Sequence, residues 1–185
     1  MIGAAELQNL ANTYNRVYLE NQETQKLICH QAEHDALTEA LNRGSYEKLL
    51  HIYETGDALF ALILIDVDIF KSVNDIYGHA VGDAILQKVT GSLKKAFRSI
   101  DYVCRIGGDE FLVLIPGITE NLFQSMIRSM LVDMAKSSVH LALGSVWVDD
   151  CTGKVEKSLS EADARMYEDK RAYYAKNRQL DRRRH

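Results

Sequence analysis

The sequence predicts an α/β chain of the α+β type, in which helices flank a mainly antiparallel central sheet and a long N-terminal helix precedes them. An uninterrupted apolar run over 59–65 is typical of a strand buried on both faces. Two further apolar runs, 102–106 and 111–115, enclose Gly107-Gly108, a hairpin pattern because glycine adopts the positive φ angles of tight turns. The apolar residues elsewhere recur mostly at helical spacing.

The first predicted element is one long helix from about Ala4 to His34, because this segment contains neither Gly nor Pro. Its seam follows the alternating three- and four-residue spacing of a coiled coil and is partly polar: Leu7, Leu10, Tyr14, Val17, Asn21, Thr24 and Ile28. An amphipathic helix packed on its own domain fits the pattern equally well. His30 and His34 lie one turn apart, but without a third ligand surface histidines are a simpler reading than a metal pair.

The first half of the predicted domain runs from a turn at 35–41 to the second strand of the hairpin. A helix over about 43–54 ends at Gly56 and Asp57, and the buried strand follows it. A short helical segment then passes Asn74 and Tyr77 and is broken at 78–82. A further helix is marked by its buried stripe, Ile85, Leu86, Val89, Leu93 and Phe97, and Pro116 stops the hairpin's second strand.

The second half adds two helices and a strand. The apolar positions Leu122, Met126, Ile127, Met130 and Met134 predict an amphipathic helix. A strand over 139–148 places Val139, Leu141 and Leu143 on one face and Ala142 and Gly144 on the other. The last helix is expected from Ser158, as N-cap with Glu161 three residues later, to about Lys176. The predicted order is β-α-α-β-β-α-β-α.

Length and composition bound the function. The 185 residues suffice for one domain and an appendage, and a net charge of −4 gives no electrostatic basis for binding long nucleic acid. Three scattered cysteines without a CxxC pair fit a reducing cytosol. No apolar run reaches membrane-spanning length, and the first residues lack a signal-peptide pattern. We therefore expect a cytoplasmic protein with no membrane segment.

Two acidic clusters carry the expected chemistry. Asp66 and Asp68 end the buried strand and share a face, where carboxylates repel one another unless a cation lies among them. A hard ion such as Mg²⁺ is the usual solution, and Lys71 adds positive charge for a polyphosphate. Asp109 and Glu110 follow the hairpin turn, although Gly-Gly-Asp alone also makes an ordinary surface turn. Together the clusters predict Mg²⁺-dependent phosphoryl or nucleotidyl transfer.

The motifs resemble those of the GGDEF family, the diguanylate cyclases. The signature itself is Gly107-Gly108-Asp109-Glu110-Phe111. The other matching segments, from about Asp35 to about Arg178, are Asp35-Ala36-Leu37-Thr38, Leu41-Asn42-Arg43, Asp66-Val67-Asp68-Ile69-Phe70-Lys71, Asn74-Asp75, Gly78-His79, Gly82-Asp83, and Ala162-Asp163-Ala164-Arg165-Met166-Tyr167 with Lys170.

The resemblance implies a palm-like domain over 35–180, akin to nucleotide cyclases and polymerases, and a helical stalk over 1–34 that joins two copies. Such a homodimer would condense two GTP molecules into cyclic di-GMP and two pyrophosphates. Asp66, the carbonyl of Val67, and Asp109 would hold Mg²⁺ (or Mn²⁺). Asp109 or Glu110 would accept the proton, with Lys71 beside them.

The resemblance also implies the contacts to nucleotide. The backbone after Asp68 with Lys71, the turn glycines and a lysine of the last helix would hold the substrate: Asp68, Ile69, Phe70, Lys71, Gly107, Gly108 and Lys170. Asn74 and Asp83 would read guanine, with His79 in support, although Asp83 also suits a helix N-cap. Arg98 and Asp101 match the family's product-inhibition site; the alternative is a helix-end arginine followed by a turn aspartate.

Two positions depart from the family pattern. Glu39 stands where the family usually has glycine, which we interpret as a local turn variation. After Lys170 the chain is longer than the family's Gly-Arg-Asn-Arg ending, so either Lys176 or Arg178 would replace the second basic triphosphate contact.

Three other functions compete with the cyclase hypothesis. A module that binds GTP or cyclic di-GMP without turnover would be expected to lose acidic motif residues, which are intact here. A phosphatase using Asp66 and Asp68, with metal ligands at 149–150, needs repeated βα units that the hairpin-containing order does not provide. A purely structural coiled-coil protein would leave Asp109 and Glu110 unexplained.

Overall fold

The computed structural model describes residues 3–56, 59–134, 139–149 and 154–176. The chain divides into two compact units, residues 1–34 and 35–185, and each is described by itself. Within the described ranges, none of the helices is both long enough and apolar enough to cross a membrane.

The first unit is the predicted long helix, α1 (Ala4–Glu33). The large apolar side chains of its seam are all exposed: Leu7, Leu10, Tyr14, Val17 and Ile28. The His30 and His34 rings stack with centroids 3.9 Å apart. Among the described residues no three His, Cys, Asp or Glu side chains gather to hold a metal, so this pair has no third ligand of those types.

The second unit is built on a four-stranded antiparallel sheet in the order β2-β3-β1-β4, with strands β1 (Phe60–Val67), β2 (Tyr102–Arg105), β3 (Glu110–Pro116) and β4 (Leu141–Val148). Every residue of β1 is buried, as its apolar run predicted, because the strand is central and covered on both faces. The expected hairpin is present as β2 and β3. In β4 the buried residues alternate, which confirms the predicted two faces.

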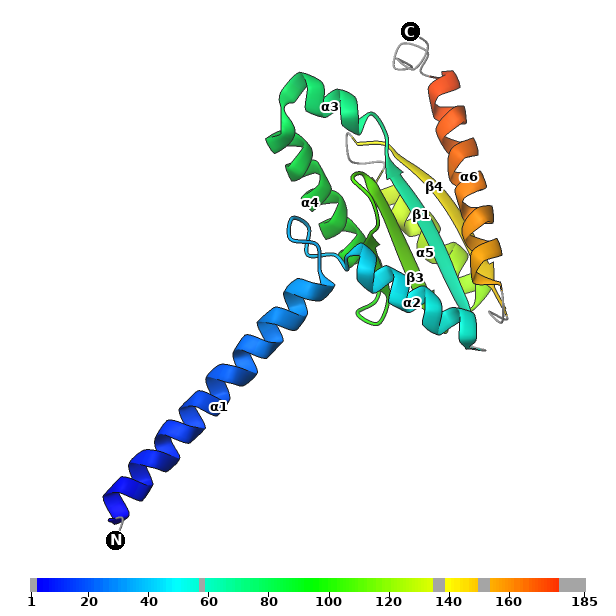
Figure 1. Ribbon diagram of the computed structural model, residues 1–185. Helices are drawn as coiled ribbons and strands as arrows, with labels where there is room; N and C mark the ends of the chain where they lie inside the picture. Colours follow the sequence, from blue (N-terminus) through cyan, green and yellow to red (C-terminus); the bar gives the residue numbers. More distant parts are fainter. Residues whose placement is uncertain (1–2, 57–58, 135–138, 150–153, 177–185) are drawn as a thin grey trace. The chain divides into compact units, whose positions relative to one another are not determined.

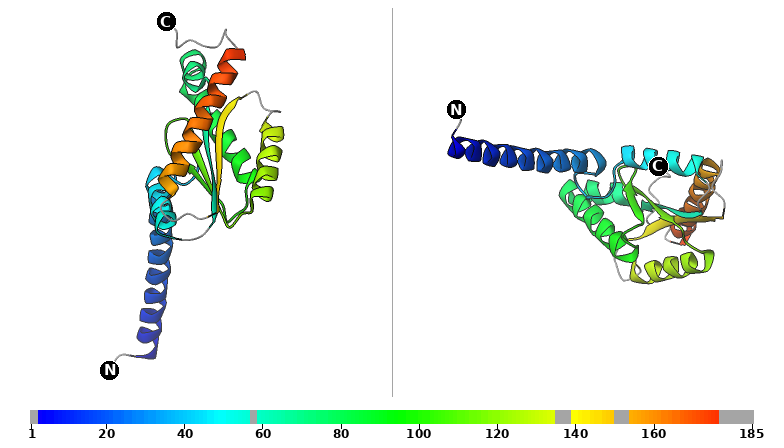
Figure 2. Two further views of the ribbon diagram at one scale, coloured as in Figure 1. Left: turned by 90° about the vertical axis from the view of Figure 1, so that its right-hand side faces the viewer. Right: turned by 90° about the horizontal axis from the view of Figure 1, so that it is seen from below.

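Helices cover both faces of this sheet (Figure 1). On one face α4 (His79–Ala96) and α5 (Glu120–Met134) enclose one apolar core. On the other face α2 (Arg43–Thr55) and α6 (Val155–Lys176) enclose a second. The short helix α3 (Phe70–Tyr77) connects β1 to α4, and Figure 2 shows the sheet edge-on between the two helical layers. The order β-α-α-β-β-α-β-α is confirmed.

Three local expectations were wrong. Helix α6 begins at Val155, so Ser158 lies inside it and donates its hydroxyl to the Lys154 carbonyl. The N–H of Val155 instead donates to the carboxylate of Glu54 in α2, at 3.1 Å. Asp83 is not an N-cap, because α4 starts at His79. The break between α3 and α4 is Gly78 alone, at φ +84°, a conformation that favours glycine.

Candidate active site

The two predicted acidic clusters meet at one edge of the sheet. In the antiparallel register of β1 and β3, Asp66 lies opposite Glu110, the last pair of the ladder. The N–H of Val67 donates to the carbonyl of Asp109 at 3.0 Å, which continues this pairing past the strand end. The site therefore combines residues more than forty positions apart, brought together by strand pairing.

A lysine from α6 contacts the acidic edge. Lys170 Nζ lies 2.5 Å from Asp66 Oδ1, and both side chains are largely buried. Burial raises the pKa of Glu110, and the carboxylates of Asp66, Asp109 and Asp163 raise it further, while Lys170 opposes them. The edge thus has more negative than positive charge and favours a further cation.

The donor set at this edge suits a hard divalent ion. Asp66 and Asp109 supply carboxylates and Val67 a carbonyl, and one Asp66 oxygen already contacts the Lys170 ammonium. Two carboxylates are enough for Mg²⁺, which completes its octahedron with waters and substrate phosphates. Among the described residues no three His, Cys, Asp or Glu side chains gather into one metal-binding group. The expected ligands, two carboxylates and one backbone carbonyl, do not require a third such side chain.

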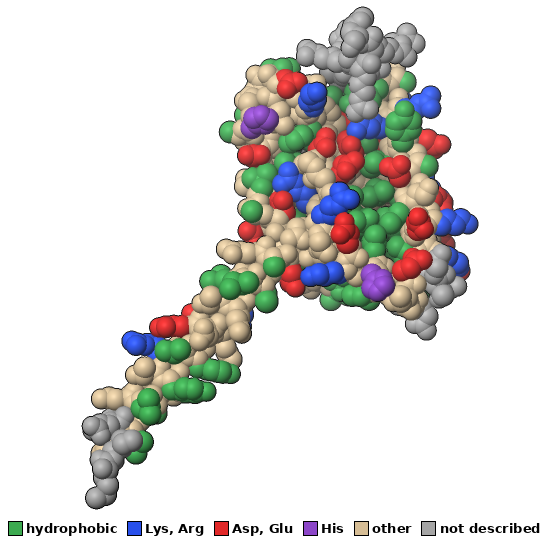
Figure 3. Space-filling view, in the orientation of Figure 1, with side chains coloured by type: hydrophobic (Ala, Val, Ile, Leu, Met, Phe, Trp, Pro, Cys, Tyr) green, Lys and Arg blue, Asp and Glu red, His purple; other side chains and the backbone are tan. Residues whose placement is uncertain are grey.

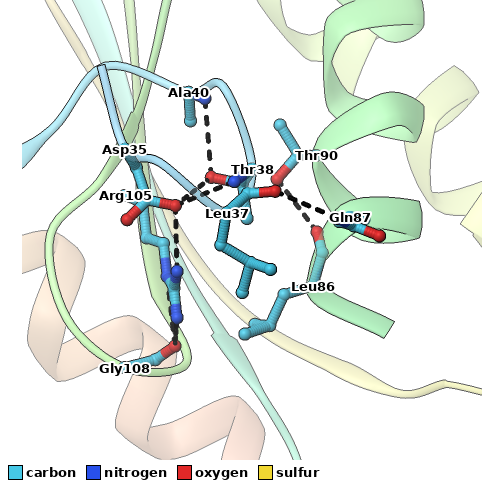
Figure 4. Close-up of polar contacts among 9 residues, drawn as sticks. All are labelled: Asp35, Leu37, Thr38, Ala40, Leu86, Gln87, Thr90, Arg105 and Gly108. Carbon is cyan, nitrogen blue, oxygen red and sulfur yellow. Dashed lines mark hydrogen bonds and ion pairs between the residues drawn. The ribbon is translucent and has the colours of Figure 1, made fainter. Parts of the chain in front are cut away.

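Arg105, the last residue of β2, links the Gly-Gly turn to the turn at 35–38, which lies outside the hairpin (Figure 4). Arg105 donates to the Gly108 carbonyl at 2.8 Å and to Asp35 Oδ1 at 2.9 Å. The same Asp35 oxygen accepts the backbone N–H and the hydroxyl of Thr38. Burial alone would raise the pKa of Asp35, but the bonds from Thr38 and Arg105 together lower it. Sequence reasoning assigned no role to Arg105 or Asp35.

Gly107 does not have the positive φ expected of a tight-turn glycine. Among the described glycines only Gly78 and Gly117 have positive φ, so neither turn glycine is required by its backbone angles. A Cβ on Gly107 would instead lie 2.5 Å from Glu110 Oε2. The N–H groups of Ile106 and Gly107 both donate to the Glu110 carbonyl, at 3.0 and 3.3 Å. The Glu110 carboxylate therefore occupies the space that a side chain at Gly107 would fill.

The turn after β1 joins this edge to α3. Asp68 is 1% exposed, and its Oδ2 lies 2.6 Å from His140 Nδ1. Burial raises the pKa of Asp68, while His140 opposes the shift. Ile69 has φ +57°, and α3 begins at Phe70 without a side-chain cap. Lys71 is exposed in the first turn. Open N–H groups at a helix start attract anions.

The residues expected to read guanine lie on the α3–α4 pair. Asn74 Oδ1 is buried and has no hydrogen-bond partner among the described residues, and a Cβ on Gly82 would lie 1.9 Å from it. Asp83 and His79 are exposed on α4. The structure therefore places the three on one helical hairpin, whose helices pack closely at Asn74 and Gly82.

Arg98 and Asp101 form an ion pair with each other. Arg98 Nη2 lies 2.7 Å from Asp101 Oδ1 and also donates to the Pro116 carbonyl at 2.9 Å. Asp101 raises the pKa of Arg98, and its own side chain is fully buried. Glu110 and Pro116 are the first and last residues of β3, and a strand rises about 3.4 Å per residue. The Arg98–Asp101 pair at Pro116 therefore lies about 20 Å from the acidic edge at Glu110.

A pocket of about 320 Å³ opens beside Glu110 on the α2–α6 face. Apolar side chains, including Tyr46, Leu159 and Met166, form most of its wall, and Glu110 and Asp163 contribute carboxylates to it. Acidic and basic side chains lie side by side on the face shown in Figure 3. His140 was missed by sequence reasoning, because an isolated histidine within the predicted strand over 139–148 carries no motif; the observed strand begins only at Leu141. Arg178 and Asp150 lie outside the described residues.

Comparison with known proteins identifies relatives for most of the chain. Residues 32–176 match the family described as "Diguanylate cyclase, GGDEF domain". The probable diguanylate cyclase DgcE of Escherichia coli (strain K12) is 34% identical over 164 residues, covering 82% of this chain and 15% of that protein. Diguanylate cyclase TpbB of Pseudomonas aeruginosa (strain UCBPP-PA14) is 32% identical over 190 residues, covering 91% of this chain and 44% of that protein.

A solved structure shares the fold. The coiled coil and GGDEF domain of DgcB from Caulobacter crescentus, in complex with c-di-GMP, matches with a TM-score of 0.76 and 21% identity. The match covers 89% of this chain and 94% of that one. The chain spans less than half the length of the two curated relatives, at 15% and 44%.

Proposed function

The chain belongs to the GGDEF family of diguanylate cyclases, and on that premise we propose that it condenses two GTP molecules into cyclic di-GMP with release of two pyrophosphates. The observation that carries the proposal is the acidic edge, where Asp66 pairs with Glu110 beside an uncapped helix start. Residues 35–180 would be the catalytic domain, and residues 1–34 a stalk that joins two copies.

The metal would be Mg²⁺ (or Mn²⁺), held by Asp66, Asp109 and the Val67 carbonyl. When bound, it supplies neutralisation of phosphate charge and a lower pKa for the attacking hydroxyl. Lys170, which contacts Asp66, adds a positive charge for the triphosphate.

We assign the proton acceptor to Glu110. Burial and the surrounding carboxylates raise its pKa, which is the direction that makes a carboxylate a better proton acceptor. Asp109 then remains a metal ligand.

The nucleotide contacts are proposed from the same geometry. The N–H groups of Ile69 and Phe70, with Lys71, would bind the terminal phosphates at the α3 start. Asn74 and Asp83 would bind guanine on the α3–α4 hairpin, because a carboxylate accepts from guanine N–H groups that adenine lacks, and His79 would support them. Cyclic di-GMP would bind at Arg98, whose side chain is 35% exposed, whereas Asp101 would act by orienting it.

The test is product formation from GTP and Mg²⁺ by the full chain. Asp66→Asn and Glu110→Gln should each lower the rate by about 100-fold or more, because the first removes a proposed metal ligand and the second the proposed proton acceptor. Glu156→Gln, an exposed carboxylate on α6, is the matched control and should behave like the parent. Near-normal product from Asp66→Asn would contradict the metal assignment. GTP binding without product by the parent would favour the binding-module alternative.

A further inference from the structure

We infer that His140 and Tyr173 are positioning residues for the phosphate-binding turn at Asp68–Phe70. The inference rests on the proposed function, since the ligand of this turn is the triphosphate of GTP. Neither residue belongs to the motifs of the sequence, and both reach the turn only through the fold.

Strand pairing brings His140 to the turn. Val67 pairs with Leu141 at the end of the β1–β4 ladder, so the next residues on each strand, Asp68 and His140, face each other. The N–H of Asp68 donates to the His140 carbonyl at 3.1 Å, and His140 Nδ1 donates to the Asp68 carboxylate at 2.6 Å. Backbone and side chain of Asp68 are thus both held by one residue.

The turn needs such support because its next residue is strained. Ile69 is β-branched and has φ +57°, a region that branched side chains rarely occupy and that persists only when its surroundings enforce it. The N-cap residue Ile69 gives α3 no side-chain cap, so the orientation of the first N–H groups of α3 depends on this backbone. The two bonds to His140 fix the residue immediately before the strained position.

Tyr173 packs against the imidazole of His140. Its ring stacks on His140 with centroids 3.6 Å apart and an interplanar angle of 16°. One turn earlier on α6, Lys170 contacts Asp66. Helix α6 therefore reaches both aspartates at the end of β1: Asp66 directly through Lys170, and Asp68 indirectly through Tyr173 and His140.

This arrangement predicts an effect on nucleotide binding and little effect on chemistry. Neither side chain belongs to the acidic edge, so their loss should leave the charges at that edge unchanged. Their loss would let the turn relax and misalign the N–H groups that bind phosphate. An interaction used equally in the bound substrate and the transition state changes KM and leaves kcat nearly constant.

The experiment measures KM and kcat for GTP with the full chain. His140→Ala should raise KM roughly 10-fold, because it leaves a buried carboxylate without its donor, with kcat within about 3-fold of the parent. Tyr173→Ala should raise KM by roughly 5-fold through loss of the stacked ring. His140→Asn retains an N–H donor and Tyr173→Phe retains the ring, so each should recover part of the loss.

Two further variants sharpen the test. The double variant His140→Ala/Tyr173→Ala should have the KM of His140→Ala alone, because Tyr173 acts through the imidazole. Tyr167→Ala removes an exposed tyrosine from the same helix, and its KM should equal that of the parent. Additive effects of the two single changes would overturn the proposed link between them.

A non-hydrolysable GTP analogue, measured by calorimetry, separates this inference from the cyclase proposal. A parent that binds the analogue but forms no product contradicts only the cyclase proposal, and a weaker Kd in His140→Ala still supports the positioning role. A parent that forms product, with the KM and Kd of His140→Ala unchanged, overturns the positioning role alone. A parallel loss of kcat and melting temperature in His140→Ala, without recovery in His140→Asn, would also overturn it.

Discussion

Glu39 occupies a backbone conformation that disfavours its side chain. Its φ is +58°, and its own N–H and carbonyl are used by Asp35 and Lys94. A left-handed conformation costs an L-residue about 1–2 kcal/mol. Glycine avoids this cost, but its greater flexibility in the unfolded chain offsets part of the gain in stability. Our interpretation of this position as a simple turn variation therefore overlooked its strain.

Replacing this residue by glycine should stabilise the protein. Glu39→Gly should raise the free energy of unfolding by about 1 kcal/mol, measured by chemical denaturation. Glu39→Ala removes the same carboxylate but retains Cβ, and it should give no comparable gain. An equal gain in both variants would show that charge, rather than backbone strain, is responsible.

Asp35 should make stability depend on pH on the acid side. Its pKa is lowered in the folded protein, so its contribution is complete above the unfolded value and is lost as pH falls through the folded value. The difference in unfolding free energy between the parent and Asp35→Asn should therefore shrink below about pH 4. Denaturation curves from neutral to acid pH measure it. A constant difference over this range would assign the effect to hydrogen-bond geometry instead of charge.

At the scale of elements, α6 packs on β4 through a glycine. A Cβ on Gly144 would lie 1.8 Å from the Ala162 carbonyl and 2.6 Å from the Met166 nitrogen. Both neighbours are helix backbone, which cannot move away as a flexible side chain could. The absence of a side chain at Gly144 lets the helix that carries Lys170 and Tyr173 approach the sheet.

Two glycine substitutions of opposite effect test this packing. Gly144→Ala should lower the free energy of unfolding by about 2 kcal/mol or more, because the helix must shift away. Gly91→Ala, in α4 with open space around the new methyl group, should raise it by about 0.5–1 kcal/mol. Thermal denaturation compares the two. Equal effects of the two changes would mean that the approach of α6 to β4 is not close.

At the scale of the whole molecule, cyclisation requires two nucleotide-loaded domains to meet. One domain would hold one GTP, so activity should depend on protein concentration unless another element holds two copies together. The exposed seam of α1 is suited to that role, since 30 helical residues extend about 45 Å and the seam is apolar except at Asn21 and Thr24.

Removing residues 1–34 should therefore lower specific activity, most clearly in dilute protein. Leu10→Glu in the full chain should act in the same direction, because it places a charge within the seam. Asn15→Glu, outside the seam, is the matched control. Specific activity measured over a dilution series checks this, and truncated protein whose activity per mole stays constant on dilution would contradict it.

Local patterns determined most of the elements and the membership of the acidic edge. The seven apolar residues over 59–65 predicted a strand buried on both faces, and the Gly-Gly turn predicted the hairpin, because periodicity and turn chemistry act over a few residues. Sequence motifs also indicated Asp66, Asp109 and Glu110. Helix boundaries were predicted less well. Ser158 satisfies a capping pattern, but at the start of α6 it is the Glu54 carboxylate of α2 that accepts the Val155 N–H.

The sequence by itself therefore determined the order of elements, the family and the acidic residues. Only the tertiary structure decided how they meet, because contacts between distant residues depend on strand register and helix packing. His140 bonds Asp68 across 72 positions, and Lys170 bonds Asp66 across 104. The same holds for Gly107, which does not have a positive φ and where the Glu110 carboxylate occupies the space that a Cβ would fill.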